Sequence, residues 1–161
     1  MPIISSEKNP EQLSLTLVTE FPVEVGRVWR LWSDPRQLER WWGPPTWPAT
    51  FERHDFVVGG TASYRMTGPD GESAPGWWRF TAIDEPRSLE FEDGFADQSG
   101  EPDPAMPVTR VVVTIEAVKG GTRMTTVSHF ASLEQLDQLV AMGMEEGMRE
   151  AAEQIDALLA A

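Results

Sequence analysis

Apolar side chains near the start of the chain first alternate with polar ones and then recur at helical spacing. Leu13, Leu15 and Leu17 lead in alternation to Phe21, which predicts a half-buried strand ended by Pro22. The next apolar positions follow the i, i+3, i+4, i+7 stripe of a short helix: Val25, Val28, Trp29 and Trp32. A second short helix is expected after it, with Asp34 as its cap and Pro35 as its first residue.

Between positions 49 and 130 the pattern changes to period-2 alternation separated by turn residues. Gly59-Gly60, Gly120-Gly121 and the segment 68–71 favour turns for backbone reasons. The alternation predicts six strands, over 50–57, 61–67, 77–83, 88–92, 109–118 and 122–130. The Pro-rich segment 97–107 is expected to be the longest loop.

The tail favours one long helix. Ser132 and Gln135 form a capping box, and no Pro interrupts positions 133–161. At the other end of the chain, residues 1–12 are polar, and we expect a loose N-terminal lead-in there. The length of 161 residues and the absence of a linker predict one domain over 1–161.

This order of elements predicts an α+β fold. Seven antiparallel strands with one apolar face need a cover, and the C-terminal helix is the only element long enough to supply it. We therefore expect a curved seven-stranded antiparallel sheet wrapped around the long C-terminal helix. The two short helices after the first strand are expected to close the open end of the sheet.

Several segments carry a resemblance to a known family. They are the segments 28–35, 38–44, 56–60, 64–66, 70–71, 83–91, 121–125 and 143–148. Together they resemble the activator of heat-shock-protein-90 ATPase homologue family, within the START-like, helix-grip (SRPBCC) superfamily. The resemblance implies a hydrophobic cavity between the sheet and the long helix, which in the superfamily binds lipids, hormones or polyketide-like rings. This family often has Trp after the helix Gly, where this chain has Met144.

A cavity is also expected from the strands and the last helix themselves. With the larger apolar residues turned inward, Thr126 and Ser128 place two hydroxyls on an otherwise apolar face, where they could orient a ligand or bond within an ordinary core. Gly143 and Gly147 lie one turn apart on the inward side of the predicted helix, beside adaptable methionines. The expected lining is Trp32, Tyr64, Met66, Trp78, Phe80, Phe91, Val113, Thr126, Ser128, Gly143, Met144, Gly147 and Met148. The expected mouth is Trp41, Trp42 and Trp47, which could instead form a contact patch for a homodimer.

The residues give no catalytic signature. The chain has no Cys, and neither His54 nor His129 has a second ligand at metal-binding spacing, so we expect no metal and no cofactor. Ser128 and His129 are neighbours in a strand and point to opposite faces. Four strand carboxylates are expected at the surface: Glu52, Glu90, Glu92 and Asp93. Catalysis by a buried carboxylate stays open, because its environment decides its pKa.

Charge and hydropathy limit the classes of partner that the protein is expected to bind. The formal net charge is −13, which disfavours nucleic acid. No apolar run is long enough to span a bilayer and no signal peptide is present, so we expect a cytoplasmic protein without membrane insertion. Seven of the acids lie on the predicted last helix, either as a solvated face or as a docking surface.

Three functional hypotheses remain. The first is the binding of a small hydrophobic, ring-containing ligand between the sheet and the C-terminal helix. The second is a cyclase, aromatase or dehydratase acting in the same cavity, which would require a carboxylate or Tyr64 inside it with a displaced pKa. The third is a co-chaperone-like interaction module that uses the acidic helix. Whether the protein is an enzyme is left open, and binding alone is favoured.

Overall fold

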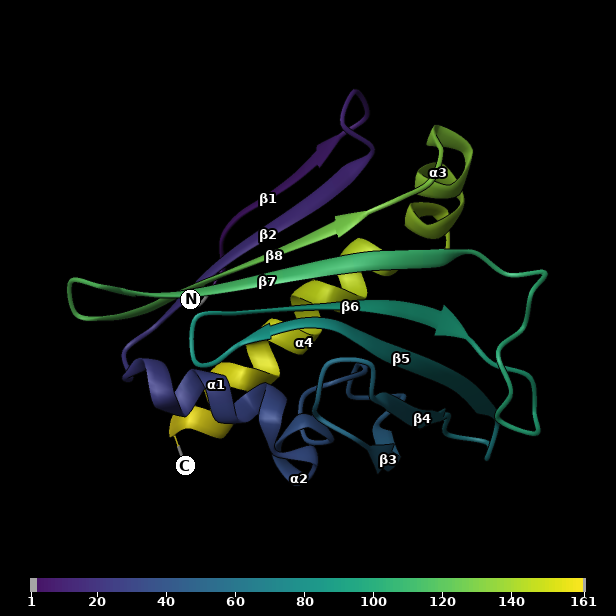
Figure 1. The fold of residues 1–161 in the computed structure, drawn as a ribbon, viewed down its shortest axis with the longest axis horizontal. Helices are drawn as coiled ribbons and strands as arrows, with labels where there is room; N and C mark the ends of the chain where they lie inside the picture. The colour runs from purple at the N-terminus through teal and green to yellow at the C-terminus, as the bar shows by residue number, and fades with distance from the viewer. Residues whose placement is uncertain (1–2, 161) are drawn as a thin grey trace.

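The structure is a computed structural model that describes residues 3–160, and its main element is one antiparallel sheet of eight strands. The sheet order is β1-β2-β8-β7-β6-β5-β4-β3 (Figure 1). The strands are β1 (Ile3–Asn9), β2 (Ser14–Phe21), β3 (Ala49–His54), β4 (Thr61–Thr67), β5 (Ser73–Asp84), β6 (Ser88–Phe95), β7 (Val108–Val118) and β8 (Gly121–His129). The helices are α1 (Val25–Ser33), α2 (Pro35–Leu38), α3 (Leu133–Ala141) and α4 (Met144–Ala160).

The helix-grip fold expected from the sequence is confirmed. In Figure 1, α4 crosses one face of the curved sheet, and α1 and α2 lie beside it below the sheet. The two short helices have the predicted start signals: Asp34 accepts a hydrogen bond from the backbone N–H of Arg36, and Pro35 is the first residue of α2. The six predicted central strands are present, and β5 begins four residues earlier than the alternation indicated.

The predicted loose lead-in is wrong, because residues 3–9 form β1 and raise the strand count from seven to eight. This strand pairs antiparallel with β2, for example Ser6 with Leu17 and Asn9 with Ser14. The alternation rule missed it because an edge strand is held by backbone hydrogen bonds and can be polar along its whole length. The side chains add two links to the helices. Ser6 Oγ donates to Glu145 Oε2 at 2.6 Å, and Lys8 Nζ lies 3.1 Å from Asp137 Oδ1.

The single long C-terminal helix is also a wrong prediction. The helix begins as expected, with Ser132 Oγ accepting from the Gln135 N–H, but it breaks between Ala141 and Met144. Gly143 at the break has φ +91°, a conformation that L side chains rarely adopt. The Gly143 N–H donates a hydrogen bond to the Val140 carbonyl at 3.0 Å, so α3 ends in a turn stabilised by a glycine just beyond its last residue.

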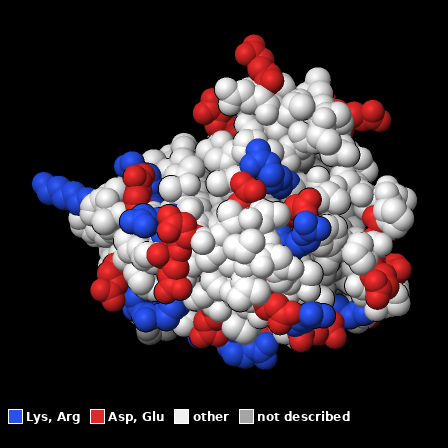
Figure 2. Space-filling model, viewed as in Figure 1, with Lys and Arg blue, Asp and Glu red and all other residues white. Residues whose placement is uncertain are grey.

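The two faces of the sheet differ sharply. The concave face carries the core, in which the rings of Trp78 and Phe91 stack with centroids 4.2 Å apart and Trp32 packs 6.0 Å from Trp78. The opposite face is covered by cross-strand ion pairs, such as Arg110 with Glu90 at 3.1 Å. Figure 2 shows basic and acidic side chains interspersed on this face. The apolar interior therefore lies wholly between the sheet and the helices.

A second, smaller apolar cluster lies under α3. It consists of Leu15, Phe130, Leu136 and Leu139, with Met144 and Met148 of α4 packed against it. The main cluster fills the other end of the fold, around α1, the second half of β5 and the first half of β6. The two clusters leave an unfilled space between them.

Candidate ligand-binding pocket

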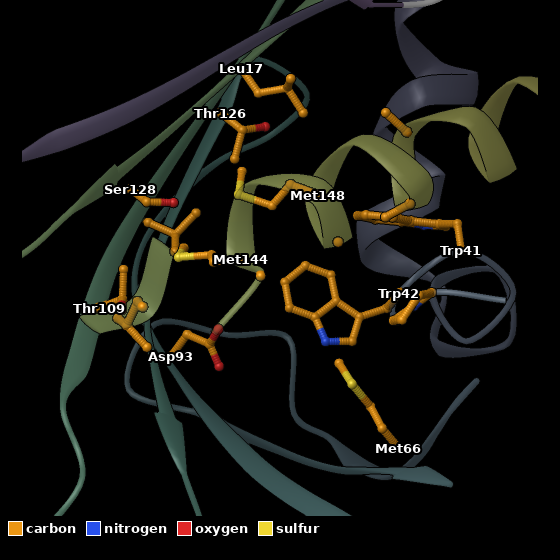
Figure 3. Close-up of a pocket in the computed structure, with 18 of the residues that line it drawn as sticks. Leu17, Trp41, Trp42, Met66, Asp93, Thr109, Thr126, Ser128, Met144 and Met148 are labelled. Carbon is orange, nitrogen blue, oxygen red and sulfur yellow. The ribbon is translucent and has the colours of Figure 1, made fainter. Parts of the chain in front are cut away.

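The unfilled space is a pocket of about 360 Å³ between the concave face of the sheet and α4. Its walls come from β2, β4, β6, β7, β8, the end of α1, the segment after α2, and both C-terminal helices. Figure 3 shows Met144 and Met148 entering it from α4, with Trp42 opposite. Most of the wall is aromatic, aliphatic or thioether carbon, the composition typical of sites for small apolar molecules.

Most residues expected in the cavity or at its mouth do line this pocket. They come from five separate segments of the chain and meet only because the sheet curves around α4. The residues are Trp32, Trp41, Trp42, Tyr64, Met66, Thr126, Ser128, Gly143, Met144, Gly147 and Met148.

Five of the expected residues lie elsewhere. Trp78, Phe80, Phe91 and Val113 point toward the concave side but are fully buried in the main cluster. They are cut off from the pocket because Trp32 of α1 packs across Trp78 and Phe91. Trp47 lies against Gly68, where a Cβ atom would approach its ring to 2.7 Å.

Trp41 and Trp42 both line the pocket but differ in how far they are buried. Trp41 is only 3% exposed, and its Nε1–H donates to the Leu31 carbonyl at 3.0 Å, so it forms inner wall rather than a surface patch for a second subunit. Trp42 is half-buried, and Figure 3 shows its indole ring facing the methionines across the pocket. Gln154 of α4 holds this segment by donating to the Gly43 carbonyl at 2.6 Å.

Asp93 is the missed pocket residue that most changes the chemistry of the site. We expected it at the surface, but it lines the pocket, and Tyr64 Oη donates a hydrogen bond to its Oδ1 at 3.0 Å. The alternation held the signal: Asp93 follows Leu89 and Phe91 at steps of two, so all three face the same side of β6. Among the lining residues, Asp93 is the only one that carries a full charge when ionised near neutral pH.

Burial sets the protonation of this pair. Burial raises the pKa of Asp93 to about 7, and the hydrogen bond from Tyr64 together with the nearby Trp78 indole N–H opposes that rise only in part. Burial, together with the neighbouring Asp93 charge, raises the pKa of Tyr64 well above its ordinary value. Near neutral pH, Tyr64 is therefore a donor and Asp93 exists in both protonation states.

Two indole N–H groups surround the pair. Trp42 and Trp78 each have a buried Nε1 atom that makes no hydrogen bond of good geometry with any described residue. Both rings contact Tyr64, with centroids 6.1 Å away and steep interplanar angles. Their N–H dipoles lie close enough to lower the pKa of Tyr64, and that of Trp78 also lowers the pKa of Asp93. The Asp93 end is thus the polar end of the pocket.

Three hydroxyl groups give the sheet wall further polarity. Thr126 and Ser128 of β8 were expected there, and Thr109 of β7 joins them. Elsewhere on the concave face, Thr19 and Thr122 donate to backbone carbonyls. The three pocket hydroxyls make no such side-chain bond to another residue between 3 and 160, so they are free to meet a ligand.

The break between α3 and α4 forms part of the pocket wall. Met142, Gly143 and Met144 line it at this point, and Gly147 follows one turn into α4. A Cβ atom added at Gly147 would meet no other atom within 4 Å. A glycine is therefore needed at position 143 because of its positive φ, whereas the missing side chain at Gly147 leaves space in the pocket.

The described residues form no metal site, and His54 lies apart from the pocket. Within residues 3–160, no three His, Cys, Asp or Glu side chains come together as metal ligands would. His54 lies outside the pocket, with Nε2 3.1 Å from the Trp32 carbonyl and its ring stacked on Phe56. Burial lowers the pKa of His54. None of the described helices combines the length and the apolar character that a membrane span needs.

The fold agrees with comparisons to known proteins. The chain matches the family model of the Activator of Hsp90 ATPase homolog 1-like protein over residues 22–160. A protein from Arthrobacter aurescens, solved by NMR, is 58% identical, with a TM-score of 0.94 over 98% of this chain and 91% of that chain. A crystal structure of a Mycobacterium smegmatis protein is 47% identical, with a TM-score of 0.91 over 98% and 97% of the two chains.

More distant structures share the fold. The AHSA1 protein from Silicibacter pomeroyi is 23% identical, with a TM-score of 0.74 over 91% of this chain and 97% of that chain. A comparison with curated proteins found no significant match. The family match covers far more than half of the sequence. The chain therefore belongs to the Activator of Hsp90 ATPase homolog 1-like family.

Proposed function

We propose that this protein binds a small apolar, ring-containing molecule in the pocket between the sheet and α4. The observation that carries the proposal is the pocket itself, about 360 Å³ of space between the sheet and α4 with a mostly apolar wall. Family membership fits either a ligand-binding or a co-chaperone-like domain. The pocket favours the first, because protein interiors leave few voids larger than a water molecule without a use for them.

The size of the pocket limits the ligand. A cavity of roughly 150 Å³ lined by apolar residues holds one benzene molecule. The pocket here has about 360 Å³, which corresponds to a two-ring system with small substituents. Burying such a ring system would supply most of the affinity, and the hydroxyls of Thr126 and Ser128 would orient its polar atoms.

The methionines suit a ligand of variable shape. Met144 and Met148 line the pocket from α4, and Met66 lines it from β4. Their unbranched thioether side chains can repack around different rings at little cost. We therefore expect a family of related molecules to bind, with one preferred among them.

The neutral, polarity-sensitive naphthalene dye Prodan tests the proposal directly. It should bind the wild-type protein with a blue-shifted, enhanced emission. Gly147→Phe places a ring in the open space beside Gly147 and removes room for one ring of the dye. Because burial of one ring contributes about 1.5–3 kcal/mol, the variant should bind the dye at least about tenfold more weakly.

Ala157→Phe is the matched control, since it adds the same ring to an exposed position of α4 outside the pocket. It should bind Prodan as the wild type does. Equal binding by all three proteins would contradict the proposal, because the dye would then lie elsewhere. Native mass spectrometry of the purified protein should also show a co-purified small molecule that Gly147→Phe excludes.

A second candidate function, acid–base catalysis in the same pocket, is favoured by the Tyr64–Asp93 pair. A carboxyl group with a pKa of about 7 can donate or accept a proton near neutral pH, as general acid–base catalysis requires. The test is incubation of a metabolite extract with wild type and with Asp93→Asn. A product formed only by the wild type supports catalysis, whereas a ligand returned unchanged by both proteins supports binding alone.

A further inference from the structure

The pocket has one charged end, and its charge is negative. Among the lining residues, Asp93 is the only one that ionises near neutral pH, and no Lys, Arg or His lines the pocket. The elements around Asp93 contribute Tyr64 from β4, Trp78 from β5 and Thr109 from β7, all uncharged. From the helical side, α4 contributes Met144, Gly147 and Met148. A ligand group that meets Asp93 therefore meets a carboxylate with no protein cation to neutralise it.

The polar atoms open to the pocket accept hydrogen bonds more readily than they donate. Tyr64 already uses its hydroxyl proton on Asp93. The indole Nε1 atoms of Trp42 and Trp78 are covered from solvent; both N–H dipoles act on Tyr64, and that of Trp78 also acts on Asp93. What remains for the ligand is the carboxylate of Asp93 and the hydroxyls of Thr109, Thr126 and Ser128. A ligand that donates hydrogen bonds and carries a positive charge complements this set.

Aromatic rings strengthen the preference for a cation. Trp32, Trp41, Trp42 and Tyr64 all line the pocket, and their faces attract positive charge. The whole protein carries a formal charge of −13, which raises the local concentration of cations and repels anions. A fatty acid or other carboxylate would meet both this field and Asp93.

We propose that the preferred ligand is a small ring compound bearing a basic amine, with its ammonium group against Asp93 and its rings between Trp42 and the methionines of α4. This inference rests on the proposed function and narrows it to one chemical class. The raised pKa of Asp93 adds a consequence, because a bound cation stabilises the ionised carboxylate. Binding of the amine should therefore pull a proton from Asp93.

Three naphthalene compounds of the same shape separate the possibilities: 2-naphthylmethylamine, 2-naphthylmethanol and 2-naphthoic acid. Their affinities would be measured by isothermal titration calorimetry at about pH 8. We expect the amine to bind about tenfold more tightly than the alcohol, and the acid more weakly than the alcohol. Between pH 5 and pH 8 the affinity of the amine should rise as Asp93 ionises, while that of the alcohol should not rise.

Asp93→Asn should remove the advantage of the amine over the alcohol and leave binding of the alcohol within about threefold. Glu92→Gln is the matched control, since it removes the same charge from the outer face of the same strand, where Glu92 pairs with Arg79. It should keep the preference for the amine. The pH dependence of amine binding by the wild type also tests whether Asp93 recognises the amine. The inference can therefore be refuted even if Asp93→Asn does not fold.

The outcomes distinguish this inference from the proposed function. If the alcohol binds and the amine binds no more tightly, the amine preference is overturned and ligand binding stands. If Asp93→Asn keeps the full preference, Asp93 is not the recognition group and the inference also fails. If none of the three compounds binds and Prodan binding is insensitive to Gly147→Phe, both proposals fail together.

Discussion

Asp93 shows how one residue can change the character of an apolar pocket. Its neighbours two and four positions back, Phe91 and Leu89, are buried in the main cluster, and Asp93 continues their side of β6 into the pocket. An acid on a strand is ordinarily exposed, and that general tendency outweighed the alternation in the sequence interpretation. The structure keeps Asp93 inside because Tyr64 donates to it and the Trp78 indole lies close by.

The stability of the protein should depend on pH through Asp93. Because the pKa of Asp93 is about 7 in the folded protein and near 3.8 in an unfolded chain, folding disfavours the ionised form. Its contribution is fully present below about pH 4 and is lost as the pH rises through about 7. Asp93→Asn should therefore be more stable than wild type at pH 8, by on the order of 2 kcal/mol after allowance for pocket water.

Urea denaturation at pH 4 and pH 8 measures this effect. The gain from Asp93→Asn should be largest at pH 8 and small at pH 4. His54 and His129 have lowered pKa values and act in the opposite direction, since their contribution is lost as the pH falls below about 6.5. Both histidines are present in both proteins, so the difference isolates Asp93. A gain of the same size at both pH values would contradict this assignment.

At the scale of elements, the break between α3 and α4 matters most for the site. A glycine just after a helix and with positive φ is a common stop signal, and Gly143 fits it. The sequence interpretation placed both glycines on one continuous helix because no Pro intervenes and the apolar spacing continues. The break turns the chain so that Met142, Gly143 and Met144 form a wall of the pocket.

The two glycines should respond to alanine in opposite ways. Gly143→Ala forces a side chain into φ +91° and should cost about 1–2 kcal/mol of unfolding free energy. Gly147→Ala lies inside α4, where its Cβ meets nothing within 4 Å, and should gain about 0.5–1 kcal/mol. Chemical denaturation of the two variants against wild type measures both. Changes of the same sign would show that the break is not a fixed feature of the fold.

At the scale of the whole molecule, the pocket exists because two apolar clusters do not merge. The main cluster surrounds Trp32 and Trp78, and the smaller one lies under α3 around Leu136. The end of the sheet nearest α3 is tied to the helices from β1, through Ser6 to Glu145 and Lys8 to Asp137. The edge strand thus helps to hold the pocket wall that α3 and the start of α4 provide.

Removing these two links should loosen that wall. Ser6→Ala combined with Lys8→Ala should raise the hydrogen-exchange rate of α3 and of the first turn of α4. The global unfolding free energy should fall by no more than about 1 kcal/mol, because exposed ion pairs contribute little. The control is Arg87→Ala, which removes an exposed ion pair with Asp84 at the β5–β6 turn. Unchanged exchange in α3 would mean that β1 does not support it.

The helix-grip fold could be predicted from the sequence, since periodicity, caps and turn residues are local signals that each element carries in its own residues. Most of the pocket lining could also be predicted, because alternation shows which side of a strand a residue such as Tyr64 or Thr126 faces. Three features became visible only in three dimensions: Trp32 closes off Trp78 and Phe91, β1 pairs along a polar edge, and Asp93 meets Tyr64. These features depend on distances between segments far apart in the chain, and local patterns contain no record of such distances.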